Sequence, residues 1–250
     1  MPSTLHPLTS LTAAGCTAVI TTAAGLWPLS VAVALAAALL AVGAGVGRRV
    51  LAAAVAVLVP LGLSLLMLHG LFFPEGRTVL AAWGPARVTA EGLSFALEAG
   101  TRTGACVLVL LLFSFTVSAP DLVAALAARG LPPQVGFVLA SALTLLPAMT
   151  GRLAAIRAAQ EARGLVVGRG LLSRLAAVRL QAVPLVLGLV EDAGVRAQAL
   201  EARSFGTPGP RTSYRQLQDS PGQRVFRAAA VLLTAAAVAL RLITAWPVAP

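Results

Sequence analysis

Two copies of the tripeptide Glu-Ala-Arg, at Glu161–Arg163 and Glu201–Arg203, are the residues best suited to specific chemistry in this sequence. Each copy closes a long helical pattern with one internal proline, Pro147 in the first and Pro184 in the second, where a bend is expected. An arginine at such an end presents a rigid fork of donors suited to carboxylates or backbone carbonyls in a partner's groove. Two similar ends therefore predict two similar receptors, as in a dimer of subunits.

Taken singly, each copy also fits an ordinary helix stop. An arginine near a helix C-terminus interacts favourably with the helix dipole, and a following glycine adopts the left-handed conformation that ends the helix. Ala128-Arg129-Gly130 has the same form and is expected to end a short amphipathic helix that starts at Asp121. The functional interpretation rests on the duplication in matching contexts and not on either copy alone.

The other arrangements that support catalysis or metal binding are missing from the sequence. Because the chain has no lysine, it cannot contain a phosphate-binding loop that depends on one. Its two histidines, His6 and His69, are far apart, and Glu191-Asp192 are neighbours that point to different faces of a helix. Cys16 and Cys106 lie in apolar runs without metal-ligand spacing. We expect a non-catalytic chain with no cofactor and no metal of its own.

The composition is that of a membrane protein. Hydrophobic residues make up 58% and charged residues 11% of the 250 residues, whereas soluble domains average about 25% charged residues. The net charge of +10 is compatible with a nucleic-acid partner, but most arginines lie between or beyond the apolar runs, as in the cytoplasmic segments of membrane proteins. We therefore expect a lipid bilayer, and no nucleic acid, as a partner.

Apolar runs of about 20 residues, the length that crosses a hydrocarbon core, predict an all-α polytopic membrane protein with about five transmembrane helices. The connection between the first two runs is tight enough for them to form a re-entrant pair instead. The five runs are Leu11–Leu26, Leu29–Val46, Val50–Phe73, Gly92–Ala119 and Val225–Trp246.

Two further helices, Gln134–Arg163 and Leu171–Arg203, have an apolar first half and a charged second half. Such helices belong at the membrane surface or in a bundle, half embedded and half presented to a partner. With a cytoplasmic N-terminus, the positive-inside rule places the Arg-rich block from Arg129 to Arg227 in the cytoplasm. The predicted segments are N-terminal transmembrane helices (1–118), cytoplasmic or interfacial coupling helices (119–223) and a C-terminal transmembrane helix (224–250).

A candidate ion pair lies inside the fourth apolar run. Glu98 and Arg102 are four residues apart in the favourable order for pairing on one helix face, and Glu91 falls near the same stripe. These charges either mark an interfacial start to the helix, with side chains that reach toward the membrane surface, or form a buried pair that locks helices together.

With these features the chain resembles the transmembrane coupling (T) component of energy-coupling factor (ECF) transporters, the EcfT/CbiQ family. The resemblance covers most of the chain, and its specificity lies in the order and spacing from Glu91 to Thr212. The matching residues are Leu5-His6-Pro7-Leu8-Thr9, Glu91-Gly92-Leu93, Arg102, Ile156, Ala159-Gln160, Ala162-Arg163-Gly164, Glu201-Ala202-Arg203 and Arg211-Thr212.

The resemblance implies a coupling subunit of an importer for a vitamin or a transition-metal ion in the bacterial inner membrane. In that family two coupling helices end in Ala-Arg-Gly motifs that dock into grooves of two ABC-type ATPase subunits, and the membrane portion embraces a small substrate-binding (S) component. By this resemblance the docking residues are Ala162, Arg163, Gly164, Ala202, Arg203 and Ser204, with Glu161 and Glu201 in support. Ser204 replaces the family's glycine, and because serine is a poorer left-handed residue, the second helix is expected to continue to Phe205-Gly206.

Two other functions fit the sequence less well. A conventional ABC permease would form its own substrate path and would typically carry one coupling helix per half. A membrane-embedded enzyme acting on lipids would need carboxylates or histidines clustered at the interface, which the sequence lacks. In a coupling subunit, Arg163 and Arg203 are expected to contact the ATPases, and the apolar faces Leu139–Leu146 and Leu185–Val190 to contact the S component.

Overall fold

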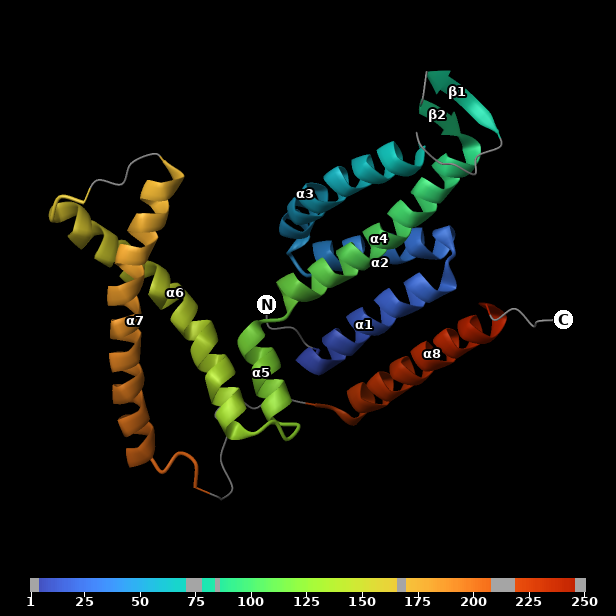
Figure 1. Ribbon diagram of the computed structural model, residues 1–250. Helices are drawn as coiled ribbons and strands as arrows, with labels where there is room; N and C mark the ends of the chain where they lie inside the picture. The colour runs from blue at the N-terminus through green and yellow to red at the C-terminus, as the bar shows by residue number, and fades with distance from the viewer. Residues whose placement is uncertain (1–4, 71–77, 84–85, 166–169, 208–218, 246–250) are drawn as a thin grey trace. The chain divides into compact units, whose positions relative to one another are not determined.

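The structure, a computed structural model, describes residues 5–70, 78–83, 86–165, 170–207 and 219–245. Helices dominate it, together with one antiparallel hairpin (Figure 1). The chain divides into two compact units, Met1–Ala125 with Leu217–Pro250 and Leu126–Gln216. In chain order the elements are α1 (Pro7–Ala24), α2 (Trp27–Gly43), α3 (Gly47–Leu65), the π-helical turn η1 (Leu66–Gly70), β1 (Val79–Trp83), β2 (Ala86–Thr89), α4 (Ala90–Thr116), α5 (Ala119–Ala127), α6 (Pro133–Ala162), α7 (Leu171–Ala202) and α8 (Pro221–Ala245).

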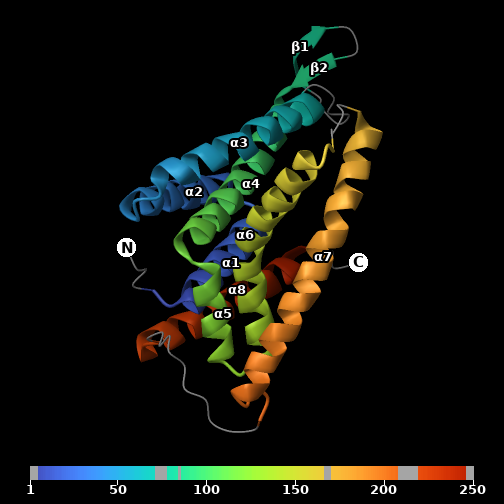
Figure 2. The ribbon, with the colours of Figure 1, turned by 90° about the vertical axis from the view of Figure 1, so that its left-hand side faces the viewer.

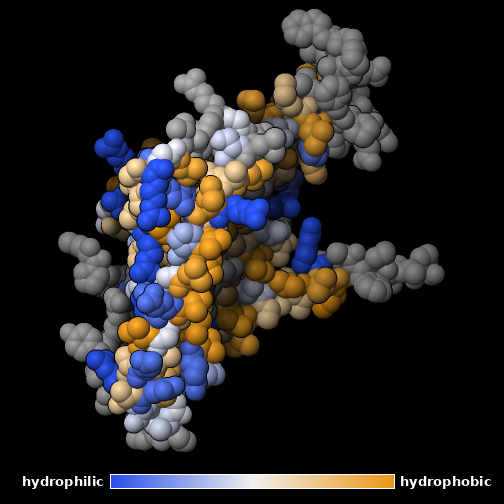
Figure 3. All heavy atoms as spheres, turned by 60° about the vertical axis from the view of Figure 1, so that its left-hand side comes forward, coloured by the Kyte–Doolittle hydropathy of each residue, from blue (hydrophilic) through white to orange (hydrophobic). Residues whose placement is uncertain are grey.

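These elements confirm the predicted all-α polytopic membrane fold. Among the described residues, four helical segments are long and apolar enough to cross a membrane, and α2 is a shorter apolar helix. At most 17% of the most apolar window of any of these four is buried inside the chain. Figure 3 shows apolar side chains over much of the visible exterior, which suits contact with lipid. The four segments are Gly47–Gly70, Ala90–Thr116, Pro133–Ala162 and Pro221–Ile243.

α6, which we interpret as a half-embedded helix, is by length and hydropathy also a candidate membrane span. Its charged residues Arg152, Arg157 and Glu161 all lie in its C-terminal part, so an uncharged stretch of nearly membrane-spanning length precedes them. None of its residues is buried within the chain. α6 therefore offers a long apolar surface to lipid or to a partner in the membrane.

Small side chains hold the first unit together. Ala14 of α1, Ala37 of α2 and Val109 of α4 form its buried apolar cluster. α1 and α2 pack on α4, and α8 packs on α1 (Figure 1). Ala41 and Ala105 are almost fully buried as well. Small residues let helix backbones approach closely, which is how helices in lipid gain packing energy.

A buried polar network fixes the start of α8 against the start of α1. Arg227 is 7% exposed and donates hydrogen bonds of 2.8 Å to the Thr9 hydroxyl and to Asp219 Oδ2. The side-chain oxygen of Gln223 accepts hydrogen bonds from the Thr9 hydroxyl and from the backbone N–H of His6. We call these five residues the terminal clasp. His6 and Thr9 of the motif Leu5-His6-Pro7-Leu8-Thr9 thus have a structural role. They help to satisfy a buried charge, which is stable only when it is paired and hydrogen-bonded.

The polar connection between α3 and α4 contains a hairpin that the sequence pattern did not indicate. β1 and β2 are antiparallel, with Val79 opposite Thr89. The carboxylate of Glu91 accepts a hydrogen bond of 3.2 Å from the backbone N–H of Thr78, so the hairpin is tied to the first turn of α4. Each strand has at most five residues, too few for a clear alternating pattern.

Candidate functional site

The predicted docking end of α6 is a Schellman cap. The Leu165 N–H donates to the Gln160 carbonyl at 3.0 Å, and the Gly164 N–H donates to the Glu161 carbonyl at 3.0 Å. Gly164 has a φ of 89°, a left-handed conformation that glycine adopts without strain. These two hydrogen bonds satisfy the last carbonyls of the helix. They leave Arg163 at the point where the chain turns away.

The end of α7 repeats these hydrogen bonds with a serine in place of the glycine. The Phe205 N–H donates to the Leu200 carbonyl and the Ser204 N–H to the Glu201 carbonyl, both at 2.9 Å. Ser204 has a φ of 53° and is the only described residue other than glycine with a positive φ. The expectation that α7 continues to Phe205-Gly206 is therefore wrong, and α7 stops at the same place as α6 relative to its arginine. The hydrogen bonds of the cap offset the cost of about 1–2 kcal/mol for one left-handed residue.

The third Ala-Arg-Gly end has the same cap. Gly130 has a φ of 99°, and the Leu131 N–H donates to the Leu126 carbonyl at 3.3 Å. The helix that it closes, α5, has only 9 residues, against 30 in α6 and 32 in α7. Cap geometry therefore does not mark a docking site by itself. The long helices and their mutual contacts distinguish the other two ends.

The arginine at the C-terminal end of each long helix is available to a partner. Arg163 and Arg203 are exposed, and neither guanidinium has an ion pair or hydrogen bond to any residue that the structure describes. Ala162 and Ala202, which precede them, are exposed as well. Each arginine thus stands on a narrow helix end that a groove can enclose, with its five N–H donors free for carboxylates or carbonyls.

The glutamates of the two ends differ in their surroundings. Glu161 accepts a hydrogen bond of 2.8 Å from Arg157 Nε, one helical turn earlier. Glu201 has Ala197 at the corresponding position and no charged partner among the described residues. The acid beside Arg163 is therefore neutralised within its helix, whereas the acid beside Arg203 is not.

An ion pair joins α6 to α7. Arg152 donates from Nη1 to Asp192 Oδ2 at 2.6 Å and from Nη2 to Oδ1 at 3.4 Å. The guanidinium lies over Gly188, where a Cβ would come within 3.5 Å of Nη1. The hydrogen bond from Arg152 lowers the pKa of Asp192 below its ordinary value, so the carboxylate is charged at neutral pH.

Arg152 and Asp192 occupy equivalent positions in the two copies. Each lies eleven residues before the arginine of its own helix end. At 1.5 Å per residue, each arm from the ion pair to its end is roughly 16 Å long. Figures 1 and 2 show that α6 and α7 run in opposite directions. The two arms therefore extend from the ion pair toward opposite ends of the helix pair.

Each of the two ends also contacts the neighbouring helix. Gln160, at the end of α6, donates from Nε2 to the backbone carbonyl of Leu180 in α7 at 2.8 Å. The ring of Phe205, just beyond α7, packs on Phe137 near the start of α6, with ring centroids 5.2 Å apart. The helix pair is thus fixed at the ion pair and on both sides of it, and these contacts set the spacing of the two ends.

The sequence analysis did not identify Arg152, Asp192 or Phe205 as parts of this site. A signal for the ion pair exists in the sequence, because aligning the two copies on their final arginines places Arg152 over Asp192. Opposite charges at equivalent positions match when two such helices cross in opposite directions. The ring contact has no comparable signal. Arg211-Thr212, also part of the resemblance, lies outside the described residues.

Glu98 and Arg102 form the ion pair that their spacing predicts, away from the helix ends. Arg102 Nη2 donates to Glu98 Oε1 at 3.0 Å, and the two side chains are 33% and 43% exposed. The same guanidinium lies at the C-terminal end of α1, where a Cβ on Gly25 would be 3.5 Å from it. The pair is therefore partly exposed and still contacts a second helix, which combines features of both interpretations.

The apolar faces predicted to contact a membrane partner are open in this chain. On α6, Leu146 is 69% exposed, and on α7 Leu187 and Val190 are each 65% exposed. Large apolar side chains with this exposure require lipid or another protein beside them.

Comparisons with known proteins give the family. Residues 1–214 match the family model CbiQ, described as cobalt transport protein. The chain is 27% identical over 180 residues to energy-coupling factor transporter transmembrane protein EcfT 1 of Listeria monocytogenes serotype 1/2a, with 68% of each protein covered. It is 28% identical over 163 residues to EcfT of Staphylococcus aureus, which covers 61% of this chain and 60% of that protein.

A further relative is a Bifidobacterium longum protein whose name describes an ABC transporter ATP-binding protein. The identity is 31% over 191 residues, which is 71% of this chain and only 24% of that protein. The chain thus spans about a quarter of this relative and 60–68% of the two EcfT proteins. Because the family model covers most of the sequence, the chain belongs to the CbiQ family, whose model is described as cobalt transport protein, and it is similar to the EcfT transmembrane proteins of energy-coupling factor transporters.

Proposed function

We propose that this protein is the transmembrane coupling subunit of an ECF-type ABC importer and that the ends of α6 and α7 dock into two ATPase subunits. The observation that carries this proposal is the equivalence of the two ends. Each presents an exposed arginine on a Schellman cap, roughly 16 Å along its helix from a shared ion pair. Two equivalent ends suit two equivalent grooves, which a dimer of ATPases provides. The ATP-binding name of the Bifidobacterium relative supports such a partner.

The transported substrate is a vitamin or a transition-metal ion, held by a separate S component in the membrane. The description of the family as cobalt transport protein supports the metal ion. The exposed apolar faces of α6 and α7, around Leu146 and Leu187, are the surfaces that would contact the S component. In this assignment the bilayer is the bacterial cell membrane, and the charged parts of both helices lie in the cytoplasm.

The helix pair is suited to transmit motion between these partners. When the ATPase dimer closes, the grooves move toward each other and carry Arg163 and Arg203 with them. Because Arg152 and Asp192 hold the arms together at their crossing point, movement of the ends changes the angle between the helices and is carried to their apolar halves. ATP hydrolysis itself belongs to the partner subunits.

The proposal is tested by charge reversal at both ends. The full chain is co-expressed with the two ATPase subunits and the S component, and the complex is purified through a tag on the chain. Arg163→Glu with Arg203→Glu is expected to abolish recovery of the ATPases, because two repulsive charges replace two docking cations. Arg129→Glu is the matched control, since it changes an arginine on the same type of cap, and it should leave recovery unchanged.

Recovery of both ATPases with the double variant would show that the ends do not dock them. The stoichiometry of the wild-type complex gives a second criterion. One copy of the chain for two ATPases is expected of a coupling subunit, whereas two copies without an S component would identify a conventional permease.

A further inference from the structure

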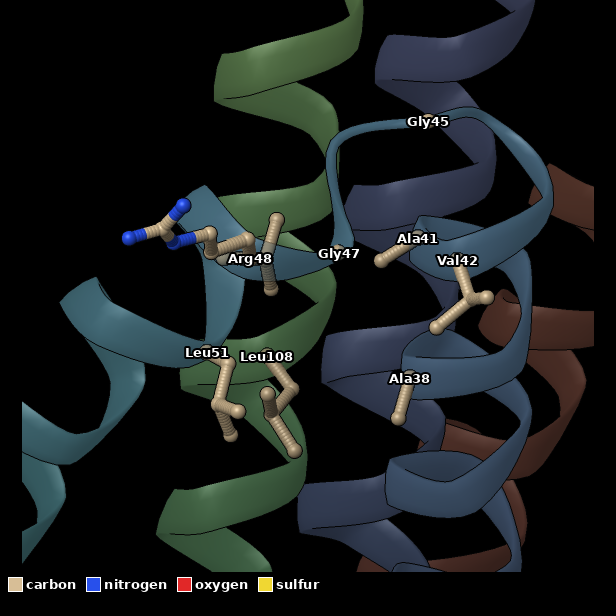
Figure 4. Close-up of a pocket in the computed structure, with 9 residues that line it drawn as sticks. Ala38, Ala41, Val42, Gly45, Gly47, Arg48, Leu51 and Leu108 are labelled. Atoms are coloured by element: carbon tan, nitrogen blue, oxygen red, sulfur yellow. The ribbon is translucent and has the colours of Figure 1, made fainter.

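The turn between α2 and α3 forms an apolar groove with one charged lining residue, Arg48. The groove has a volume of about 450 Å³ and lies among α2, α3 and α4. Figure 4 shows Ala38 and Val42 of α2 on one side, with Leu51 of α3 and Leu108 of α4 on the other. The side chain of Arg48 extends away from α2, so its guanidinium lies at the edge of this group.

Arg48 lines this edge, and Arg49 is the next residue of α3. Arg48 and Arg49 are both exposed, and neither has an ion pair or hydrogen bond to another residue that the structure describes. They follow the apolar helix α2 and open α3, which begins a candidate membrane span. The turn therefore lies where apolar helices meet the membrane surface, and its positive charge favours the cytoplasmic leaflet.

Charge and size together indicate the occupant. The guanidinium of Arg48 at the edge of an apolar groove, with a second exposed arginine next to it in the chain, complements a molecule with an anionic head and an apolar tail. Anionic lipids are found in the cytoplasmic leaflet. A volume of about 450 Å³ equals that of roughly fifteen water molecules. That is room for much of one acyl chain, whereas a helix about 10 Å in diameter would fit for only about one turn.

We propose that this groove binds an anionic glycerophospholipid, with its phosphate held by Arg48 and Arg49 and one acyl chain lying between Ala38, Leu51 and Leu108. The bound lipid lies in the groove lined by α2, α3 and α4, beside the turn that joins α2 to α3. All residues of this site belong to the first unit, whereas the helix ends that we assign to docking belong to the second.

The experiment measures lipid retention by the full chain in mild detergent. Native mass spectrometry counts bound lipids after incubation with palmitoyl-oleoyl phosphatidylglycerol or, at the same concentration, with the zwitterionic phosphatidylcholine of the same chains. We expect one phosphatidylglycerol to bind roughly tenfold or more tightly than phosphatidylcholine. Arg48→Gln with Arg49→Gln should lower its affinity about thirtyfold, the effect of two arginines beside an anionic surface. Arg179→Gln with Arg196→Gln, which removes two exposed charges from α7, is the matched control and should have no effect.

Two further experiments distinguish binding in the groove from general attraction between the arginines and an anionic lipid. Ala38→Phe fills the groove and keeps both arginines, and it should also release the lipid; it decides the matter if the double glutamine variant does not fold. sn-Glycerol 3-phosphate, the soluble part of the same headgroup, should not displace the lipid at equal concentration. The proposal is overturned if both lipids are retained equally, or if the Arg48 and Arg49 variant retains lipid as well as the wild type does. It is also overturned if Ala38→Phe leaves retention unchanged or if glycerol phosphate displaces the lipid.

Discussion

The ends of α6 and α7 share a backbone and an arginine but differ in almost everything around them. Both close with the same two hydrogen bonds, and both expose the arginine that precedes the left-handed residue. At the end of α6 that residue is the relaxed Gly164, and Glu161 is paired with Arg157. At the end of α7 it is Ser204, and Glu201 stands without a charged partner among the described residues.

The comparison shows which features the two ends share and which features differ between them. The cap and the exposed cation occur in both copies, although the second cap requires a strained serine. The supporting residues vary between an ion pair in α6 and an aromatic contact beyond α7, where Phe205 packs on Phe137. We infer that the position of the arginine is the common requirement. The predictions below test that equivalence.

The largest effect is expected from removing one arginine at a time. Arg163→Ala and Arg203→Ala should each weaken ATPase docking by about 2 kcal/mol or more, roughly thirtyfold, as for buried arginine anchors in interfaces. Because the arms are of equal length, the two losses should agree within about 0.5 kcal/mol. Titration of the purified chain with the ATPases measures both. A large loss for one variant and none for the other would show that the ends are not equivalent.

In contrast to the exposed helix ends, the terminal clasp is a buried network within the first unit, and its effect should appear in stability. Arg227 and Arg224 both bind Asp219 Oδ2, at 2.8 and 3.3 Å, but their side chains are 8% and 66% exposed. Arg227→Met removes the buried guanidinium and leaves Asp219, whose side chain is 14% exposed, beside the more distant Arg224, so it should cost about 2 kcal/mol of unfolding free energy. Arg224→Met, the matched control, should cost less than about 1 kcal/mol. Thermal unfolding in detergent measures both, and equal shifts would contradict a structural role for the clasp.

Exchanging the residues at the two caps should change stability in opposite directions. Ser204→Gly relieves a left-handed serine and is expected to stabilise α7 by about 1 kcal/mol, less a few tenths for the greater freedom of glycine in the unfolded chain. Gly164→Ser introduces the same strain at the end of α6, with no atom within 4 Å of the new Cβ to add a clash, and should destabilise by a similar amount. Protection of the last amides of each helix from hydrogen exchange measures both changes. Shifts of the same sign would contradict the common cap.

The sequence predicted the membrane fold and the end of α6 well because both depend on local signals. Long apolar runs leave few structures other than helices in lipid, and an arginine followed by glycine is a local helix stop. The hairpin β1–β2 escaped prediction because its strands are too short for residue preferences to indicate them. The left-handed Ser204 escaped prediction because the hydrogen bonds of the cap outweigh the weak preference of serine against this conformation.

Contacts between distant parts of the chain were the harder part. The Arg152–Asp192 pair joins residues forty positions apart, and the clasp joins Thr9 to Arg227. Neither has a spacing that points to it within one helix. The Arg152–Asp192 pair could have been found only by aligning the two Glu-Ala-Arg helices, which places Arg152 over Asp192. Such pairs decide how the helices are positioned, and therefore where the predicted arginines lie.

The smallest effect concerns the crossing point, where pH is the probe. Arg152 lowers the pKa of Asp192, so the pair stabilises the helix crossing at every pH above the ordinary aspartate pKa of about 3.9. That contribution is lost only as the pH falls through the lower pKa of the folded state. Spin labels at Ala159 and Ala199, exposed and equally far from their helix ends, report the distance between the arms. The distance distribution should be constant from pH 7 to pH 5 and should broaden below about pH 4.

Asp192→Asn supplies the control, because asparagine keeps the shape of the side chain but cannot form the ion pair. This variant should show the broadened distribution already at pH 7 and no further change on acidification. If the wild type broadens between pH 7 and pH 5, a group other than Asp192 controls the crossing. If the Asn variant keeps the narrow distribution, Gln160 and Phe205 hold the arms without the ion pair, and the equivalence of the two ends rests on those contacts instead.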